Sequence, residues 1–253
     1  MNRNGLVFYR GPSQIDGKPI VGILSGLLSG SDNIKTGNLI QSYILVDNDK
    51  FPHENASYGN ADVSVCGDCI HRGSKEQKSG SCYVNLGQGP YNVFKQYKEG
   101  KYKEFEKSDR ILLSGKYIRM GAYGDPSAIP YEVWEELTWS ADDHTGYTHQ
   151  WRVCDQRFRY MCMASIDNDS EYDFAKLLGW RTFRVKNKDE QQLKYEIVCP
   201  ASPDLEKKRT CQTCMACNGA RDIVGGDKRR DIVINVHGLV WKKDVFSKKV
   251  SLL

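Results

Sequence analysis

Four cysteines near the C-terminal end of the chain carry its clearest chemical signal. Cys211, Cys214 and Cys217 form a CxxCxxC run, and Cys199 precedes that run by eleven intervening residues. Thiols spaced in this way converge on one centre when the chain turns tightly, and four thiolates complete either a tetrahedral zinc site or a [4Fe–4S] cluster. A compact run of three plus one remote cysteine favours the cluster, because zinc sites more often use two paired CxxC units. We expect these four cysteines to bind metal, with zinc as the alternative to iron.

A second group of cysteines lies in the first third of the chain. Cys66 and Cys69 form a CxxC pair, Cys82 follows after twelve intervening residues, and His71 stands between them. These four side chains could close a structural zinc site. Alternatively, the three thiolates hold three irons of a [4Fe–4S] cluster and leave the fourth iron open to a ligand or substrate, which would make the site catalytic. In a third arrangement, both cysteine groups contribute to one site in a sheet that closes on itself.

The rest of the composition is that of an ordinary globular protein. The 253 residues are 40% apolar and 27% charged, and the formal net charge of +4 permits a nucleic-acid partner without requiring one. No apolar run approaches the ~18 residues of a membrane span, and the first residues lack a secretory signal, so we expect a cytoplasmic protein without a membrane partner. Nine cysteines there indicate metal or redox chemistry rather than disulfides. Cys154 and Cys162 stand apart, and we expect them to be buried thiols.

Strand-like and helix-like segments alternate through the second half of the chain. Strands are expected in KYIRMGAYGDP, TGYTHQW, RYMCMASID, RTFRVKN, KYEIVCPAS and DIVINVHG, and helices at Pro130 to Ser140 and in EYDFAKLLGW. This alternation predicts an α/β fold with a parallel sheet, either a partial or a closed (β/α) barrel like a TIM barrel, with cysteine-rich metal-binding loops. We expect residues 1–60 to be a loop-rich N-terminal segment with one or two strands, and residues 61–253 to form the barrel-like part of one structural domain. Residues 91–109 are expected to form two helical pieces that break at Gly100.

Polar and metal-binding residues follow several of these strands. Because ligand-binding groups collect at the C-terminal ends of parallel strands, these residues should share one rim of the sheet. The set consists of Gly124-Asp125, His149 to Arg152, Ser165 to Asp169, Cys199 to Ser202 and His237-Gly238. Asp125, His149 and Asp167 are the candidate catalytic residues, for positioning and proton transfer.

The order of motifs between Asn33 and Gly238 resembles an uncharacterised family of phage and plasmid proteins whose core looks like a divergent radical SAM barrel. The motifs that carry it are NIKTG at Asn33 to Gly37, SCYV around Cys82, YIRMGAYGDP with YEVWEEL, TGYTHQW, MASID, GWRTFRV, and VCPAS with CQTCMACNG. The resemblance implies a bacteriophage or plasmid origin and a partial barrel with cluster cysteines before it and a further set near its end. In radical SAM enzymes, three cysteines at CxxxCxxC hold a cluster whose open iron takes the amino and carboxylate groups of S-adenosylmethionine. An aromatic residue commonly follows the third, as in Cys82-Tyr83, although the spacing here is CxxC followed by twelve residues and then the third cysteine.

These observations give one leading function and two alternatives. The leading one is an iron–sulfur enzyme, radical-SAM-like, that uses S-adenosylmethionine or another ligand to modify a nucleotide, a nucleic acid or a protein. The first alternative is a zinc-stabilised nucleic-acid-binding or regulatory protein with structural cysteines. The second is a transglycosylase-like base-exchange enzyme, in which Asp125 or Asp167 is the nucleophile and the C-terminal cysteines with His237 bind zinc. Oligomeric state is not indicated by any pattern.

Overall fold

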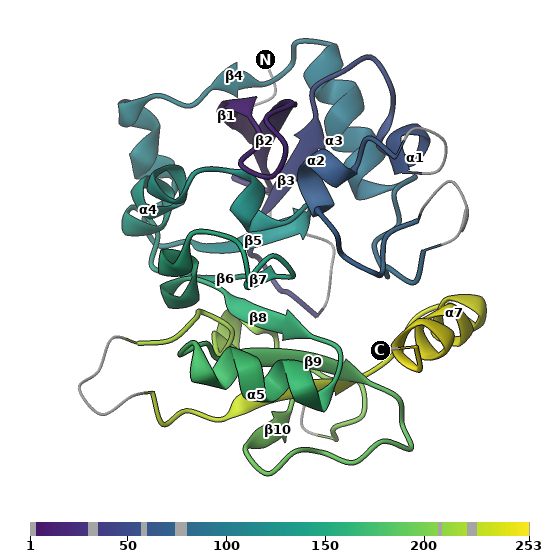
Figure 1. Cartoon of the computed structure of the whole chain (residues 1–253). Coiled ribbons are helices and arrows are strands. Elements are labelled where there is room, and N and C mark those ends of the chain that lie inside the picture. The colour runs from purple at the N-terminus through teal and green to yellow at the C-terminus, as the bar shows by residue number, and fades with distance from the viewer. Residues whose placement is uncertain are drawn as a thin grey trace.

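Strands of the N-terminal half form a mixed sheet of six strands, which the computed structural model shows in the upper part of Figure 1. The structure describes residues 4–29, 35–56, 60–73, 80–206, 209–221 and 227–252. The order is β4-β1-β2-β3-β5-β6, where β1 is Gly5–Pro12, β2 Pro19–Ser25, β3 Ile40–Val46, β4 Lys103–Glu104, β5 Tyr117–Tyr123 and β6 Asp143–Thr145. β2 pairs antiparallel with both β1 and β3, whereas β3, β5 and β6 run parallel to one another.

The C-terminal half forms a second sheet, in which all five strands run parallel. Its order is β10-β11-β9-β8-β7, with β7 at Tyr147–Thr148, β8 at Met163–Ile166, β9 at Thr182–Lys186, β10 at Glu196–Val198 and β11 at Asp231–Asn235. Only Gly146 separates β6 from β7, so one continuous stretch of chain passes from the first sheet to the second. A side chain at Gly146 would come within 2.7 Å of the Cys162 sulfur, which explains why a glycine occupies this junction.

Helices connect the parallel strands. The α-helices are α1 Pro52–Glu54, α2 Val63–Cys66, α3 Gly89–Lys98, α4 Tyr131–Trp139, α5 Asp169–Leu177, α6 Cys211–Cys214 and α7 Val240–Val250, and the 3-10 helices are η2 Lys107–Leu112, η3 Pro126–Ala128 and η4 Gln156–Tyr160. α5 begins where the Asn168 side chain accepts a hydrogen bond from the backbone N–H of Glu171, and two acidic residues stand in its first turn. α4 is anchored by Trp134, which is fully buried and donates its indole N–H to the carbonyl of Pro126.

Two apolar clusters form the core. The larger lies among β1, β2, β3 and β5 and continues to β8 and α5 of the second half, and it includes the fully buried Trp134, Trp151 and Trp180. The smaller lies in the second sheet around Met163, Ile232 and Ile234. This smaller cluster also contains Cys199 and Cys217, so part of the C-terminal cysteine group is built into the core of the second sheet.

The structure confirms the predicted α/β class and the parallel sheet, and it places strands at the six predicted segments and helices at both predicted ones. The described part of the chain forms two sheets and no closed barrel, with β4 and β6 at the edges of the first sheet and β10 and β7 at the edges of the second. No helix in the described residues is long and apolar enough to cross a membrane.

Three details of the sequence prediction were wrong. The segment expected to be loop-rich with one or two strands holds three, and because β3 pairs with β5 it shares one sheet with the residues beyond position 60. The strands are recognisable in hindsight from the buried runs of β2 and β3, which glycine and serine interrupt. After Gly100, the second expected helical piece is instead β4 and then η2. The sequence pattern also gave no indication of α7, whose apolar residues lack helical periodicity.

Candidate functional site

A cavity of about 430 Å³ opens at the C-terminal ends of the parallel strands. Its volume lies in the range of small-molecule sites, and its position is the one that ligands take in α/β folds. It is lined by Lys35, Thr36, Cys66, Cys69, His71, Ser81, Cys82, Tyr83, Val84, Arg119, Gly121, Ala122, Tyr123, Gly124, Asp125, Thr145, Tyr147, His149, Ser165, Asp167, Phe183, Val185, Cys211, Ile234, Val236, His237 and Phe246. All three candidate catalytic residues and the first cysteine group therefore face one hollow.

The thiols of Cys66, Cys69 and Cys82 face the cavity together. Burial raises the pKa of the Cys66 thiol well above its usual value, and the nearby charge of Asp62 adds to this effect. Burial likewise raises the pKa of Cys69 to about 12 and that of Cys82 to about 11. Without a positive counterion, all three thiols are therefore held in their protonated form.

Local backbone bonds bring these cysteines together. Cys66 ends α2, Gly67 follows with a positive φ of 60°, and the N–H of Cys69 turns back to the carbonyl of Cys66 at 3.4 Å. Thirteen positions further on, Cys82 donates its N–H to the carbonyl of His71 at 2.8 Å. A third bond, from the N–H of Asp125 to the carbonyl of Val65 at 2.6 Å, ties this turn to the end of β5. The cysteine turn is therefore fixed to the rim of the sheet.

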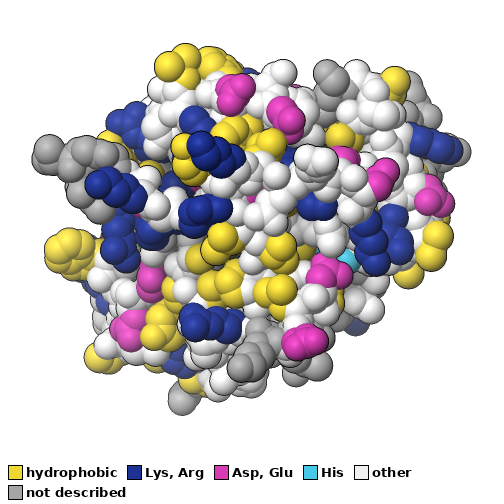
Figure 2. All heavy atoms as spheres, turned by 90° about the horizontal axis from the view of Figure 1, so that it is seen from below, with side chains coloured by type: hydrophobic (Ala, Val, Ile, Leu, Met, Phe, Trp, Pro, Cys, Tyr) yellow, Lys and Arg dark blue, Asp and Glu magenta, His cyan; other side chains and the backbone are white. Residues whose placement is uncertain are grey.

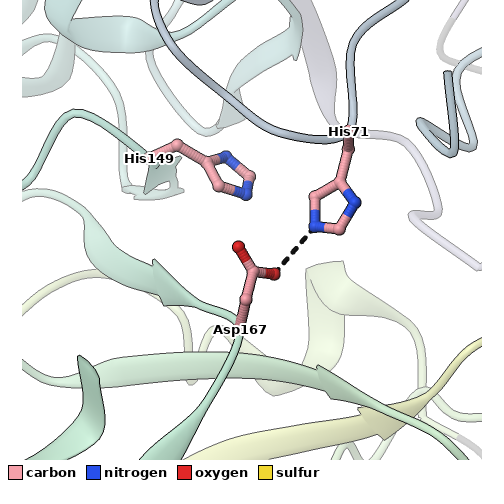
Figure 3. Close-up of side chains that lie close together, drawn as sticks. All are labelled: His71, His149 and Asp167. Atoms are coloured by element: carbon pink, nitrogen blue, oxygen red, sulfur yellow. Dashed lines mark hydrogen bonds and ion pairs between the residues drawn. The ribbon is translucent and has the colours of Figure 1, made fainter. Parts of the chain in front are cut away.

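His71, His149 and Asp167 form a polar cluster on the cavity wall, shown in Figure 3. Nε2 of His71 lies 2.7 Å from Oδ1 of Asp167, and its Nδ1 lies 2.7 Å from the hydroxyl of Ser81. The ring of His149 packs edge-on against that of His71, with 5.6 Å between ring centroids. Both nitrogens of His71 are thus engaged by Ser81 and Asp167, so this histidine is grouped with the strand-end residues rather than with the cysteines.

The ionisation of Asp167 is set by these neighbours. Burial acts to raise the pKa of its carboxyl, but the hydrogen bond to His71 and the charges of His71, His149 and Arg152 lower the pKa overall. One ligand atom from each of His71, His149 and Asp167 lies within 4.8 Å of the others, and imidazole and carboxylate ligands suit zinc or ferrous iron. The cluster has the chemistry of a proton-transfer pair or of a divalent-cation site.

Asp125 has a different environment from Asp167. Its Oδ1 accepts hydrogen bonds from the N–H and the hydroxyl of Ser127, at 3.0 and 2.8 Å, and its Oδ2 accepts one from the backbone N–H of His149 at 2.8 Å. The carboxylate is buried and starts η3 as its N-cap. Since its oxygens already hold the strand end that carries His149, Asp125 acts on the site by positioning that histidine.

The C-terminal cysteine group surrounds a smaller hollow of about 30 Å³ beside the main cavity, and Cys199, Cys211, Cys214 and Cys217 all line it. The N–H of Cys211 bonds to the carbonyl of Lys35 at 2.9 Å, and the N–H of Gly146 bonds to the carbonyl of Cys217 at 2.9 Å. The loop is therefore joined both to the N-terminal part of the chain and to the junction between the sheets. Burial raises the pKa of Cys217 to about 12.

The two hollows adjoin, since Lys35, Thr145, Tyr147, Phe183 and Cys211 line both. The sequence left open whether the two cysteine groups form one site or two. In the structure each group faces its own hollow, and Cys211 alone among the cysteines faces both. The two cysteine groups therefore lie at neighbouring hollows that share a wall.

Helix α7 contacts the first cysteine turn, and Figure 1 shows this helix to one side of the second sheet. Lys242 donates to the carbonyls of Cys82 and Val84, and Lys249 donates to the carbonyl of Ile70. Between them, Phe246 is buried and stacks on the ring of His71, with 5.2 Å between centroids. The last helix thus holds the loop that carries Cys69 and Cys82.

Most of the predicted rim residues are brought together as expected. Asp125, His149, Ser165, Asp167 and His237 line the cavity, while Cys199 lines its smaller neighbour. Cys162 is fully buried in the core, as predicted, and Cys154 packs partly buried against it. In the NIKTG motif, Lys35 and Thr36 line the cavity, while Asn33 and Ile34 lie outside the described residues.

Sequence reasoning missed Arg119, Tyr123 and Tyr147 as site residues, although all three line the cavity. Arg119 alternates with the buried Ile118 and Met120 along β5, so a period of two placed it on the face opposite these core residues, whereas Tyr123 is itself part of the core. That alternation was a usable signal.

The face of the molecule that is seen from below the view of Figure 1 carries no continuous basic band among its described residues. Figure 2 shows one face of the molecule, on which Lys and Arg side chains lie interspersed with acidic and apolar ones rather than in a continuous band. Comparisons of this chain with protein-family models, with curated proteins and with solved structures give no match. The functional argument therefore rests on the chemistry of the site.

Proposed function

We propose that this protein is an iron–sulfur enzyme whose cavity takes a small-molecule substrate next to a [4Fe–4S] cluster held by Cys66, Cys69 and Cys82. The observation that carries the proposal is the convergence of these three thiols on a cavity of about 430 Å³ at the C-terminal ends of the parallel strands. Three thiolates leave one iron of such a cluster open to a ligand from the cavity. The ligand we propose is S-adenosylmethionine, as in the radical SAM enzymes that the motif order resembles.

The spacing of the cysteines supports a cluster rather than a single zinc ion. With Zn–S bonds of ~2.3 Å, the sulfurs of a tetrahedral zinc site lie about 3.8 Å apart. Among the described residues, only His71, His149 and Asp167 bring three ligand atoms within 4.8 Å of one another, so neither cysteine group is drawn in that tightly. In a cluster each thiolate binds a different iron, and the sulfurs are correspondingly further apart. The donor set of three or four thiols also fits iron–sulfur chemistry.

We propose a second metal centre at Cys199, Cys211, Cys214 and Cys217. These four thiols complete the ligand set of a [4Fe–4S] cluster without an open iron, so this centre serves structure or electron transfer. When bound, the first cluster would supply one-electron chemistry to a ligand in the cavity. The protein's own residues would hold the substrate, exclude water and move a proton, the last through the His71–Asp167 pair and His149, which face the same cavity.

Metal and acid-labile sulfide analysis tests the proposal. The protein is purified without air and compared with three variants: Cys66→Ala/Cys69→Ala/Cys82→Ala, Cys211→Ala/Cys214→Ala, and the control Cys154→Ala. We expect iron with matching sulfide in the wild type, about half of both in each of the first two variants, and no loss in the control. Zinc without sulfide in the wild type would contradict the proposal and assign the cysteines a structural role.

The use of S-adenosylmethionine has its own test. After reduction, the iron-containing wild type should cleave S-adenosylmethionine to 5′-deoxyadenosine, and the Cys66→Ala/Cys69→Ala/Cys82→Ala variant should not. Cleavage that persists in this variant would show that the reaction does not depend on Cys66, Cys69 and Cys82. Its absence from a fully loaded wild type would show that the open iron has another ligand.

A further inference from the structure

Arg119 is a charged side chain on the wall of the cavity, and no carboxylate in the described part of the chain pairs with it. It lies in the middle of β5, paired in register with Gln41 on β3 and Thr145 on β6. Its guanidinium donates a hydrogen bond to the hydroxyl of Tyr83 at 2.6 Å. The side chain is partly buried and lines the cavity, so an anion bound there would pair with it.

The buried arginines beside and in β9 have hydrogen-bond partners within the protein, and the carbonyls of Ala216, Gly219 and Arg230 accept hydrogen bonds from Arg181. Arg184 is buried in the second sheet, and Glu196 accepts two hydrogen bonds from it, both at 2.8 Å. The groups around Arg119 are instead Tyr83, Tyr147, Tyr43 and the Cys211 thiol, none of which is a carboxylate. The planar fork of a guanidinium matches a phosphate or a carboxylate, which it binds through two parallel hydrogen bonds.

The surroundings of Arg119 indicate what the anion is attached to. Tyr147 and Phe183 line the cavity beside it, with 4.4 Å between ring centroids, and Tyr83 stacks on His237 at 6.0 Å. Aromatic walls of this kind take a flat or apolar body. Lys35 lines the same region and adds a second positive charge, which acts on His237 and Cys211. The acidic residues of the cavity, Asp125 and Asp167, belong to the other cluster, around His149.

We infer that Arg119 is the anion-binding residue of the substrate site, and that the substrate is a small molecule with a phosphate or carboxylate on a planar body. This inference deepens the proposed function, since it names the substrate class of the same cavity, and it rests on that function only in treating the cavity as a substrate site. The competing role for Arg119 is to balance the negative charge of a cluster at Cys211.

Calorimetric titration of the anaerobically purified protein tests the inference. The probes are adenosine 5′-monophosphate, benzoate, and adenosine as an uncharged body, and the variants are Arg119→Gln, Arg119→Lys and the control Arg110→Gln. Arg110 is exposed and pairs with Glu136 on the surface. Since a charged hydrogen bond contributes ~1.5–3 kcal/mol, we expect Arg119→Gln to weaken the binding of the anionic probes about 10- to 100-fold. Arg119→Lys should weaken their binding less, and Arg110→Gln should leave it unchanged. The anionic probe that binds more tightly shows whether the site prefers a phosphate or a carboxylate.

Several results would overturn the inference. The first is that neither anionic probe binds to the wild type, and the second is that Arg119→Gln binds these probes as tightly as the wild type does. The third is that the wild type binds adenosine and its monophosphate with equal affinity and does not bind benzoate. Iron is measured in the same samples. Loss of iron from Arg119→Gln with undiminished anion binding would assign the residue to cluster charge, whereas an iron-free wild type that still binds the anion through Arg119 would refute the proposed function alone. Circular dichroism of Arg119→Gln confirms that it is folded.

Discussion

Nε2 of His71 lies 2.7 Å from Oδ1 of Asp167, although 96 positions separate the two residues. The contact joins the first cysteine loop to the end of β8, and both side chains are buried. It therefore connects the element that would carry the cluster with the rim of the sheet. Removing one partner leaves a buried polar group without its hydrogen bond, which costs ~1–3 kcal/mol.

Asp167→Ala should lower the free energy of unfolding by about 1–3 kcal/mol, because the His71 ring loses its partner. The control is Asp169→Ala, at an exposed position two residues away. Urea denaturation followed by circular dichroism measures both. Equal stability of the two variants would mean that the His71–Asp167 contact contributes nothing to the fold.

Much of this site could be predicted from the sequence because its residues follow from local rules. Asp125, His149 and Asp167 each stand just after a strand that its own pattern revealed, and parallel strands end at one rim. The partnership of His71 with Asp167 had no local signal, because it depends on where a loop of the first half lands on the second sheet. The same holds for α7, which lacks helical periodicity and is positioned by Phe246 and two lysines.

The turn that carries Cys66 and Cys69 depends on Gly67. Its φ is +60°, and a Cβ there would lie 2.4 Å from the side-chain amide of Gln150, which itself bonds to Asp68 at 2.7 Å. Gly100 has a similar φ of +65° but has no atom within 4 Å of that position. A side chain at Gly100 would therefore meet backbone strain alone, whereas a side chain at Gly67 would meet both backbone strain and steric overlap.

Gly67→Ala should destabilise the protein more than Gly100→Ala, which carries only the ~1–2 kcal/mol cost of a left-handed residue with a side chain. Gly67→Ala should also bind less iron, because the Gln150 side chain must move and the cysteine turn moves with it. Thermal denaturation and iron analysis of both variants measure the difference. Matching melting temperatures and iron contents would show that the turn tolerates the added methyl group.

Lys242 and Lys249 hold the first cysteine loop by donating to its carbonyl groups. Their replacement in Lys242→Ala/Lys249→Ala should let this loop open more often, since each lost bond contributes ~1 kcal/mol. We expect alkylation of Cys69 and Cys82 in the metal-free protein to become about 30-fold faster, the factor that a loss of ~2 kcal/mol gives, as measured by mass spectrometry of the peptides.

The matched control for this pair is Lys243→Ala/Lys248→Ala, which removes the same charge from the same helix. Among the described residues, these two side chains make no hydrogen bond or ion pair. If both double variants accelerate alkylation equally, the effect comes from the charge of α7 and not from its bonds to the loop.

The second cysteine group depends on a buried ion pair. Glu196 begins β10, the strand that leads to Cys199, and its carboxylate accepts hydrogen bonds from the buried Arg184 on β9. Glu196→Ala leaves Arg184 buried with its main partner removed, a change that costs ~3–5 kcal/mol in other buried pairs. For a chain of this length each kcal/mol shifts the melting temperature by ~2–4 °C, so we expect a fall of about 6–20 °C.

Glu190→Ala is the control for the ion pair, because Glu190 also reaches Arg184, at 3.4 Å, but its side chain is 32% exposed. A partly exposed pair contributes ~0–1 kcal/mol, so this variant should melt within about 4 °C of the wild type. The two variants also separate the metal centres. Because β10 ends next to Cys199, Glu196→Ala should lose iron from the C-terminal centre. It should still cleave S-adenosylmethionine at the cluster held by Cys66, Cys69 and Cys82. Loss of both the C-terminal iron and this cleavage would mean that the two centres do not form independently.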